Sequence, residues 1–103
     1  MSLPEATRLP RVDVQEESEA PRGWSYHVVL EYETGRVSEH TVSLNWVDHD
    51  YWSGGKLPPS MVVRQVLEYL LARMDASGFP ASFDAARARR WFPAIDTDIR
   101  IQG

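Results

Sequence analysis

Residues 24–46 read WSYHVVLEYETGRVSEHTVSLNW, and their pattern is the strongest structural signal in the chain. In its first part, apolar and aromatic residues occupy every even position from Trp24 to Tyr32. In its second part, the apolar residues Val42, Leu44 and Trp46 again stand on even positions. A period of two is typical of a strand that buries one face. The sequence therefore predicts an antiparallel β-hairpin with its even residues turned toward a core.

The loop of this hairpin is predicted by the same parity. A two-residue loop at Thr34-Gly35 would set even residues opposite odd ones, and the two apolar faces would point in opposite directions. A three-residue loop over 33–35 instead pairs Val28 with His40. It also puts Gly35 at the loop position that requires a left-handed backbone. The same loop sets Tyr32 beside Arg36, within reach of a cation–π contact.

The chain beyond the hairpin turns a corner over residues 45–55 and then enters an amphipathic helix. Asp48 is a candidate N-cap for a single helical turn, which Gly54 can end in the left-handed conformation. Pro59 suits the first position of a helix over 59–75 that ends near Gly78. The apolar residues of that helix fall at helical spacing: Val62, Val63, Val66, Leu67, Leu70, Leu71 and Met74.

The two ends of the chain give weaker signals. Residues 1–23 contain three prolines and an acidic cluster, which is typical of a mobile arm, although alternation over 9–15 also fits an edge strand. Asp84 can cap a short helix that must end before Pro93. We therefore expect a two-layer α+β domain over 24–103, with 1–23 as an arm or edge strand. In it a hairpin, or a three-stranded sheet, packs against helix 59–75 and short C-terminal helices.

Composition excludes several classes of protein. The chain has 103 residues, of which 43% are hydrophobic and 25% charged, and no apolar run approaches the roughly 20 residues that span a bilayer. It lacks cysteine, which excludes disulfides and thiolate ligands, and its N-terminus has no signal-peptide pattern, so we expect a cytoplasmic protein. The net charge of −4 and the pI near 5.3 disfavour non-specific binding to nucleic acid.

Residues 40–100 resemble a family of small bacterial proteins of unknown function. The resemblance rests on a strand, a Gly-Gly and proline corner, an amphipathic helix ending in a leucine pair, and two aromatic motifs. These motifs are Ser53-Gly54-Gly55-Lys56-Leu57-Pro58-Pro59, Glu68-Tyr69-Leu70-Leu71, Phe83-Asp84 and Arg90-Trp91-Phe92-Pro93-Ala94-Ile95. The resemblance implies one compact domain and carries no activity with it.

The corner holds the candidate binding residues: Trp46, Asp48, His49, Asp50, Tyr51 and Trp52. Tryptophan and tyrosine are enriched in protein interfaces, which favours a non-enzymatic interaction or regulatory module, with a protein partner or a second copy of the chain. The alternative is a small ligand-binding protein or enzyme, because carboxylates beside an imidazole tune its protonation. It predicts a concave pocket at the corner.

Metal and nucleic-acid sites are weaker hypotheses. Parity places His27 and His40 on opposite faces of the hairpin, so we expect no histidine-based metal site and no cofactor. The only basic cluster, Arg87, Arg89 and Arg90, is a second alternative, a nucleic-acid surface, although three arginines on a short helix more often form a solvated face. No catalytic signature is present, so we expect no enzyme and name no catalytic residue.

Overall fold

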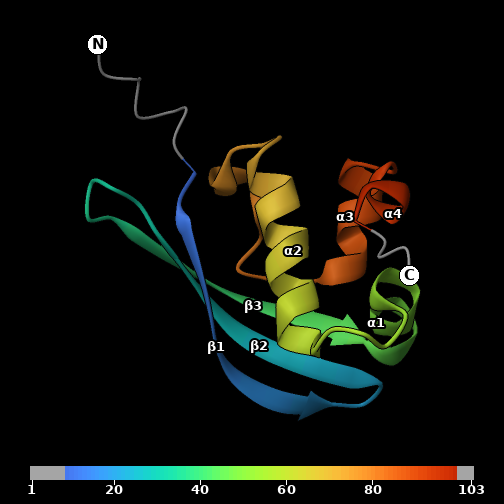
Figure 1. Cartoon of the computed structure of the whole chain (residues 1–103). Coiled ribbons are helices and arrows are strands. Elements are labelled where there is room, and N and C mark those ends of the chain that lie inside the picture. The colour runs from blue at the N-terminus through green and yellow to red at the C-terminus, as the bar shows by residue number, and fades with distance from the viewer. Residues whose placement is uncertain (1–8, 100–103) are drawn as a thin grey trace.

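The computed structural model describes residues 9–99 and shows an α+β protein with a four-stranded mixed sheet. The strands lie in the order β1 (Arg11–Ala20), β2 (Gly23–Glu31), β3 (Val37–Asn45) and β4 (Ser82–Asp84). Helix α1 (Trp46–Ser53) follows β3 directly, and helix α2 (Pro59–Leu71) crosses one face of the sheet (Figure 1). The sequence predicted two or three strands, and the sheet has four.

The central hairpin of β2 and β3 has the predicted register. Tyr26 lies opposite Val42, and Val28 lies opposite His40. The loop is the three-residue one, since the backbone N–H of Tyr32 donates to the carbonyl of Arg36 at 2.9 Å. Gly35 has φ 88°, which L side chains rarely adopt, and Arg36 lies 4.9 Å from the centre of the Tyr32 ring. Parity in the sequence is therefore enough to define this hairpin.

Residues 11–20 form the edge strand β1, so the mobile-arm interpretation is wrong for them. The turn at residues 21–22 has two residues and sets odd residues of β1 opposite even residues of β2, as in the pair Glu17 and Tyr26. A β-bulge between Val14 and Glu17 adds one residue and reverses this parity. Val12 and Val14 consequently face the core side of the sheet, opposite Leu30 and Val28. The rest of the predicted arm, residues 1–8, lies outside the described residues.

Helix α2 buries the predicted apolar stripe against the sheet but is shorter than predicted. It begins at Pro59 as expected and ends at Leu71, and the chain then forms a separate 3-10 turn, η2 (Ala76–Gly78). Asp75 caps that turn by accepting from the backbone N–H of Ser77 at 2.8 Å. The helix therefore ends four residues before the predicted residue 75, and Gly78 ends η2 instead.

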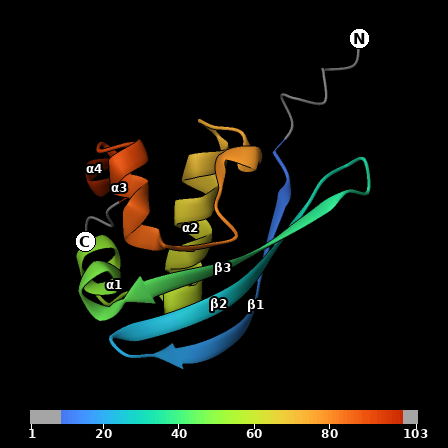
Figure 2. The same cartoon turned by 180° about the vertical axis from the view of Figure 1, so that it is seen from behind.

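The C-terminal segment adds a parallel strand and three short helical turns. β4 pairs with β3 through residues 82–84, and Asp84 then caps the turn η3 (Ala85–Arg87), as predicted, by accepting from the backbone N–H of Ala86. Helices α3 (Ala88–Trp91) and α4 (Ile95–Asp98) follow. Both views place them beside α2 and next to α1 (Figures 1 and 2). The core lies between the sheet and these helices, and its largest fully buried side chains are Trp52, Tyr26, Leu30, Leu44, Leu67, Leu70 and Ile95.

Candidate functional site

Helix α1 forms the predicted corner, and its first turn is capped by Asn45. The Asn45 side chain accepts from the backbone N–H of Asp48 at 2.8 Å, so the prediction that Asp48 caps this helix is wrong. Gly54 ends the helix with φ 61°, as predicted, and its N–H donates to the carbonyl of Asp50. Because β3 runs directly into the capped helix, the orientation of α1 is tied to the end of the sheet.

Two arcs divide the surface of α1, since residues four apart lie on the same side of a helix. The inner arc contains Asp48, His49, Trp52 and Ser53. Three of these side chains are buried and His49 is half-buried. The outer arc contains Trp46, Val47, Asp50 and Tyr51, all of them exposed. The helix is therefore inverted, with mostly polar residues inside and mostly apolar residues outside.

Arg89 holds the inner arc against the C-terminal helices. Its guanidinium donates to Asp48 at 2.7 Å and to Asp96 at 2.6 Å, and it lies 4.6 Å from the ring centre of Trp52. The indole N–H of Trp52 also donates to Asp96, at 2.9 Å. Burial alone would lower the pKa of Arg89, but its hydrogen bonds to Asp96 and Asp48 outweigh this effect and raise it. These four side chains connect α1, α3 and α4.

The other inner-arc residues bond to nearby backbone. The ring of His49 donates from Nε2 to the carbonyl of Leu57 at 2.7 Å and makes an edge contact with Trp24. Ser53 donates its hydroxyl to the carbonyl of His49 and accepts from the backbone N–H of Gly55. Among the described residues, no buried side-chain nitrogen or oxygen lacks a partner. The polar interior of α1 is fully satisfied by the protein itself.

The predicted acid–base cluster does not converge in space. Asp48 pairs with Arg89, His49 bonds to Leu57, and Asp50 is exposed on the opposite arc. Two hollows are prominent in the described structure, and neither of them is lined by residues 48–50. Within residues 9–99, no three histidine, aspartate or glutamate side chains gather into a group that could hold a metal ion.

The predicted arginine cluster is also divided. Arg89 is engaged by its two carboxylates, whereas Arg87 and Arg90 are exposed. Of the three candidate nucleic-acid residues, the structure leaves only these two outside the ion-pair network. Their surface carries less positive charge than the sequence alone indicated.

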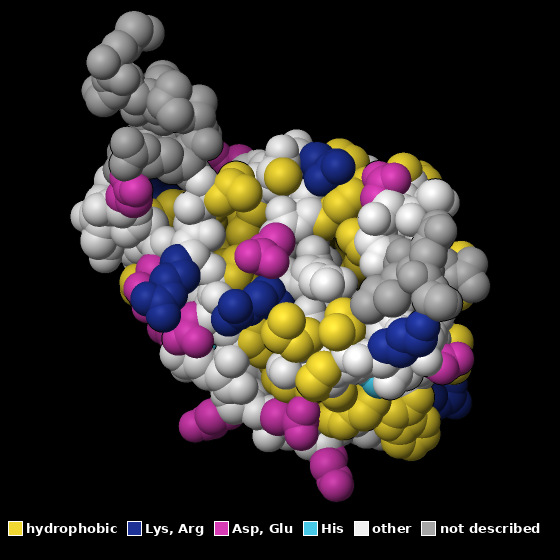
Figure 3. Space-filling view, viewed as in Figure 1, with side chains coloured by type: hydrophobic (Ala, Val, Ile, Leu, Met, Phe, Trp, Pro, Cys, Tyr) yellow, Lys and Arg dark blue, Asp and Glu magenta, His cyan; other side chains and the backbone are white. Residues whose placement is uncertain are grey.

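The outer arc exposes three large apolar or aromatic side chains. The exposed fractions are 56% for Trp46, 77% for Val47 and 40% for Tyr51. Further hydrophobic side chains gather in Figure 3, over the start of α2 and the adjacent end of the sheet. Met61, on the first turn of α2, is 40% exposed. The end of the molecule that carries α1 is thus rich in accessible apolar side chains.

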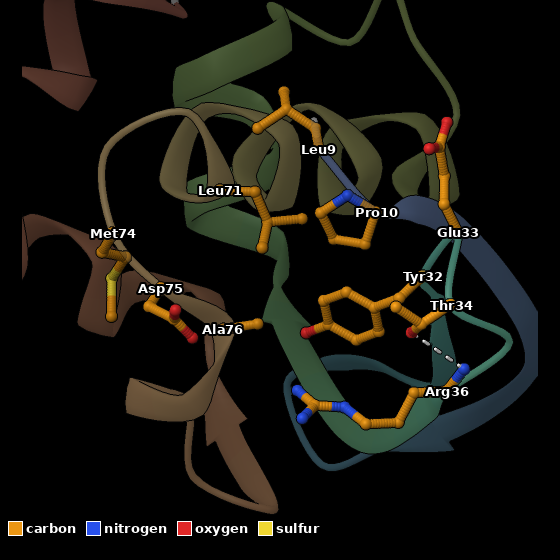
Figure 4. A pocket seen from close by; sticks show the side chains of 10 residues that line it. All are labelled: Leu9, Pro10, Tyr32, Glu33, Thr34, Arg36, Leu71, Met74, Asp75 and Ala76. Atoms are coloured by element: carbon orange, nitrogen blue, oxygen red, sulfur yellow. Dashed lines mark hydrogen bonds between the residues drawn. The ribbon is translucent and has the colours of Figure 1, made fainter. Parts of the chain in front are cut away.

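The first hollow, which we call the hairpin hollow, has a volume of about 340 Å³ and lies at the other end of the sheet (Figure 4). Its walls come from residues 9–10, the β2–β3 loop and the chain after α2, and they include Tyr32, Arg36, Leu71 and Asp75. The second, of about 440 Å³, lies beside the β1–β2 turn and reaches Asn45. The hairpin hollow could not be predicted from the sequence, because its walls come from three segments far apart in the chain.

The fold and the surface together define an α+β protein with an inverted helix at the end of its sheet. Comparison with models of known families, with curated proteins and with solved structures finds no match to the chain. The resemblance to a bacterial family therefore stays a prediction. Across the described residues, no helix is both long and apolar enough to cross a membrane.

Proposed function

We propose that this protein is a non-enzymatic interaction module whose docking surface is the outer arc of α1. The observation that carries the proposal is the inverted helix, in which Asp48 is buried while Trp46 and Val47 are exposed. Isolated exposed apolar residues are ordinary on protein surfaces, but an exposed apolar helix face opposite a buried polar one is not. A partner that covers this face would remove it from water.

The composition and rigidity of the outer arc suit binding. Tryptophan and tyrosine are the side chains that most often carry the binding energy of protein interfaces. The Arg89 network and the cap at Asn45 fix α1 from two directions, so little of its backbone has to be ordered when a partner binds. The surface is therefore preorganised as well as apolar.

The proposed partner is a different protein with an apolar groove bordered by a lysine or arginine. A short helix that places anchors on one side commonly docks into such a groove. Asp50 lies within the outer arc, and the whole chain carries a net charge of −4, so a basic border complements it. A second copy of this chain would bring two Asp50 carboxylates together and add the repulsion of two acidic proteins. We place this encounter in the cytoplasm, in keeping with the lack of cysteine.

Two matched variants test the proposal. Val47→Asp puts a charge on the outer arc, and Val37→Asp makes the same change at an exposed valine of β3 far from α1. Affinity isolation from native cells identifies the partner, and titration with the purified partner then compares the variants. We expect Val47→Asp to weaken binding at least tenfold and Val37→Asp to leave it unchanged.

Three further results bear on the partner. Binding that weakens with added salt and is lost in Asp50→Lys would support the basic border. Equal binding by Val47→Asp and the unchanged protein would contradict the proposal. Self-association that Val47→Asp removes would assign the surface to a second copy and contradict the heterologous partner.

A further inference from the structure

The hairpin hollow has the form of a small-molecule site and lies away from α1. It sits where the β2–β3 loop approaches the chain that follows α2 (Figure 4). Its volume of about 340 Å³ is near the lower end of the roughly 300–1,000 Å³ range of ligand pockets. A ligand that fits it must be small.

The wall of the hairpin hollow is apolar on most sides. Leu71 and Ala76 are each 7% exposed, and the half-buried side chains of Pro10, Tyr32 and Met74 complete the surface. Figure 4 shows Leu71, Pro10 and the Tyr32 ring facing one another across the opening. Such a wall suits an apolar or aromatic side chain.

Arg36 and Asp75 stand on one side of the hollow, and Glu33, a further carboxylate in its wall, already has a partner of its own. The Arg36 side chain extends beneath the Tyr32 ring toward the segment that holds Asp75 and Ala76 (Figure 4). Asp75 uses one carboxylate oxygen, Oδ1, to accept from Ser77. Within the described residues, the ion pairs involve His27, Glu39, Arg89, Asp48 and Asp96, and neither Arg36 nor Asp75 is among them. Neither charge is therefore neutralised by an ion pair in this part of the chain.

Asp75 is charged at neutral pH. The backbone N–H of Ser77 is the main cause that lowers its pKa, the side chain of Ser77 is the next, and the positive charge of Arg36 adds a smaller contribution in the same direction. A ligand with only a negative charge would be attracted by Arg36 and repelled by Asp75, and a ligand with only a positive charge would meet the reverse.

We propose that the hairpin hollow binds a small zwitterion with an apolar side chain, that is, an apolar α-amino acid. Its carboxylate binds the guanidinium of Arg36, and its ammonium group binds the carboxylate of Asp75, which also accepts from Ser77. Its side chain occupies the apolar space beside Leu71 and Tyr32. This site does not depend on the outer arc of α1, so the two proposals stand or fall separately.

A titration of the full-length protein with three related probes tests the proposal, followed by the backbone amide signals of residues 32–36 and 75–76. L-Phenylalanine carries both charges, 3-phenylpropionate lacks the ammonium group, and phenethylamine lacks the carboxylate. We expect saturable binding of L-phenylalanine and at least tenfold weaker binding of both analogues. 3-Phenylpropionate loses the bond to Asp75 and is still repelled by it. Phenethylamine loses the bond to Arg36 and is still repelled by it.

Variants separate this site from non-specific association. Asp75→Asn retains an oxygen that can accept from Ser77 but loses the charge, so it should bind L-phenylalanine at least tenfold more weakly and 3-phenylpropionate more tightly. Arg64→Gln, an exposed change on α2 outside the hollow, is the control and should bind as the unchanged protein does. If neither L-phenylalanine nor L-leucine nor L-methionine shifts these signals saturably, the proposal is overturned. Equal binding of L-phenylalanine and 3-phenylpropionate would also overturn it.

Discussion

Gly23 shows at the scale of one residue how closely β2 and β3 approach at the end of the sheet. It lies opposite Asn45, and a Cβ atom at this position would stand 2.0 Å from the carbonyl oxygen of Leu44. The atoms that this Cβ would meet belong to the backbone of Leu44 and Asn45, so they cannot rotate away as a side chain could. The close approach allows the N–H of Trp46 to bond to the carbonyl of Arg22 at 2.8 Å, which joins the start of α1 to the β1–β2 turn.

Substitution of Gly23 is therefore expected to be costly. Gly23→Ala should lower the free energy of unfolding by about 3 kcal/mol, at the upper end of the usual range for overpacking. Gly35→Ala is the comparison, because a Cβ there meets no atom within 4 Å and the cost comes only from the positive φ. That cost should be about 1 kcal/mol. Urea denaturation measures both, and a smaller effect at Gly23 than at Gly35 would contradict this register.

Tyr26 provides a prediction about alkaline pH. Burial of its ring is the main cause that raises its pKa above the ordinary value of 10.0, and the hydrogen bond to Glu17 and the charge of Glu17 add to it. The unfolded chain therefore loses this proton first as pH rises. The contribution of Tyr26 is complete below pH 10 and falls above it. Urea denaturation should show that Tyr26→Phe loses less stability than the unchanged protein between about pH 9 and pH 11, and equal losses would contradict the assignment.

The faces of individual residues could be predicted, but their partners could not. Parity alone placed His27 and His40 on opposite sides of the hairpin, and His27 indeed bonds to Glu39 on the outer side while His40 is 7% exposed. The choice of cap at α1 was beyond the sequence, because asparagine and aspartate cap helices about equally well. Asp48 is drawn away from that role by Arg89, 41 positions later in the chain.

At the scale of the element, α1 depends on the Arg89 network for its orientation. The side chain of Asp48 is 8% exposed, and Arg89 neutralises its charge. Arg89→Met removes that partner and leaves a buried carboxylate, which should lower the free energy of unfolding by about 3 kcal/mol. Thermal unfolding measures this loss. The double variant Arg89→Met, Asp48→Leu should recover part of the stability. If the double variant loses as much free energy of unfolding as the two single variants lose together, or more, the pairing is contradicted.

The two tryptophans of α1 make a second comparison at this scale. Trp52 is 1% exposed, whereas Trp46 is 56% exposed. Trp52→Ala should lower the free energy of unfolding by about 3 to 5 kcal/mol because it opens a cavity in the core. Trp46→Ala should change it by less than about 0.5 kcal/mol. Denaturation followed by circular dichroism distinguishes the two, and similar losses would contradict the assignment of inner and outer arcs.

Elements were predictable where one hydrophobic period continued without interruption. The hairpin and α2 met this condition, although α2 ends at Leu71 and the chain then forms a separate turn that Asp75 caps. β1 did not, because its bulge breaks the alternation between Val14 and Glu17. β4 has three residues, too few to show a period, and its pairing with β3 links positions about 41 apart in the sequence. The sheet was consequently underestimated at both of its edges.

At the scale of the whole molecule, the sheet separates two different surfaces. α1 follows the C-terminal end of β3, and the hairpin hollow lies beside the loop that precedes β3 (Figures 1 and 4). The candidate binding residues named from sequence all fall on α1, where Asp48 and Trp52 hold the helix in place and Trp46 and Tyr51 face outward. The sequence names the residues of this helix, and the fold separates those that hold α1 in place from those that stay exposed.

Site-specific photo-crosslinking in native cells tests whether the outer arc of α1 is a docking surface. A photoreactive residue replaces Val47 in one variant and Val37 in the control, and mass spectrometry identifies the attached peptide. We predict that position 47 attaches to one other protein, in an apolar groove beside a lysine or arginine, and that Asp50→Lys abolishes the product. If position 47 attaches no more than position 37 does, the outer arc is not a docking surface. Attachment to a second copy of this chain would contradict the proposal of a different protein as the partner.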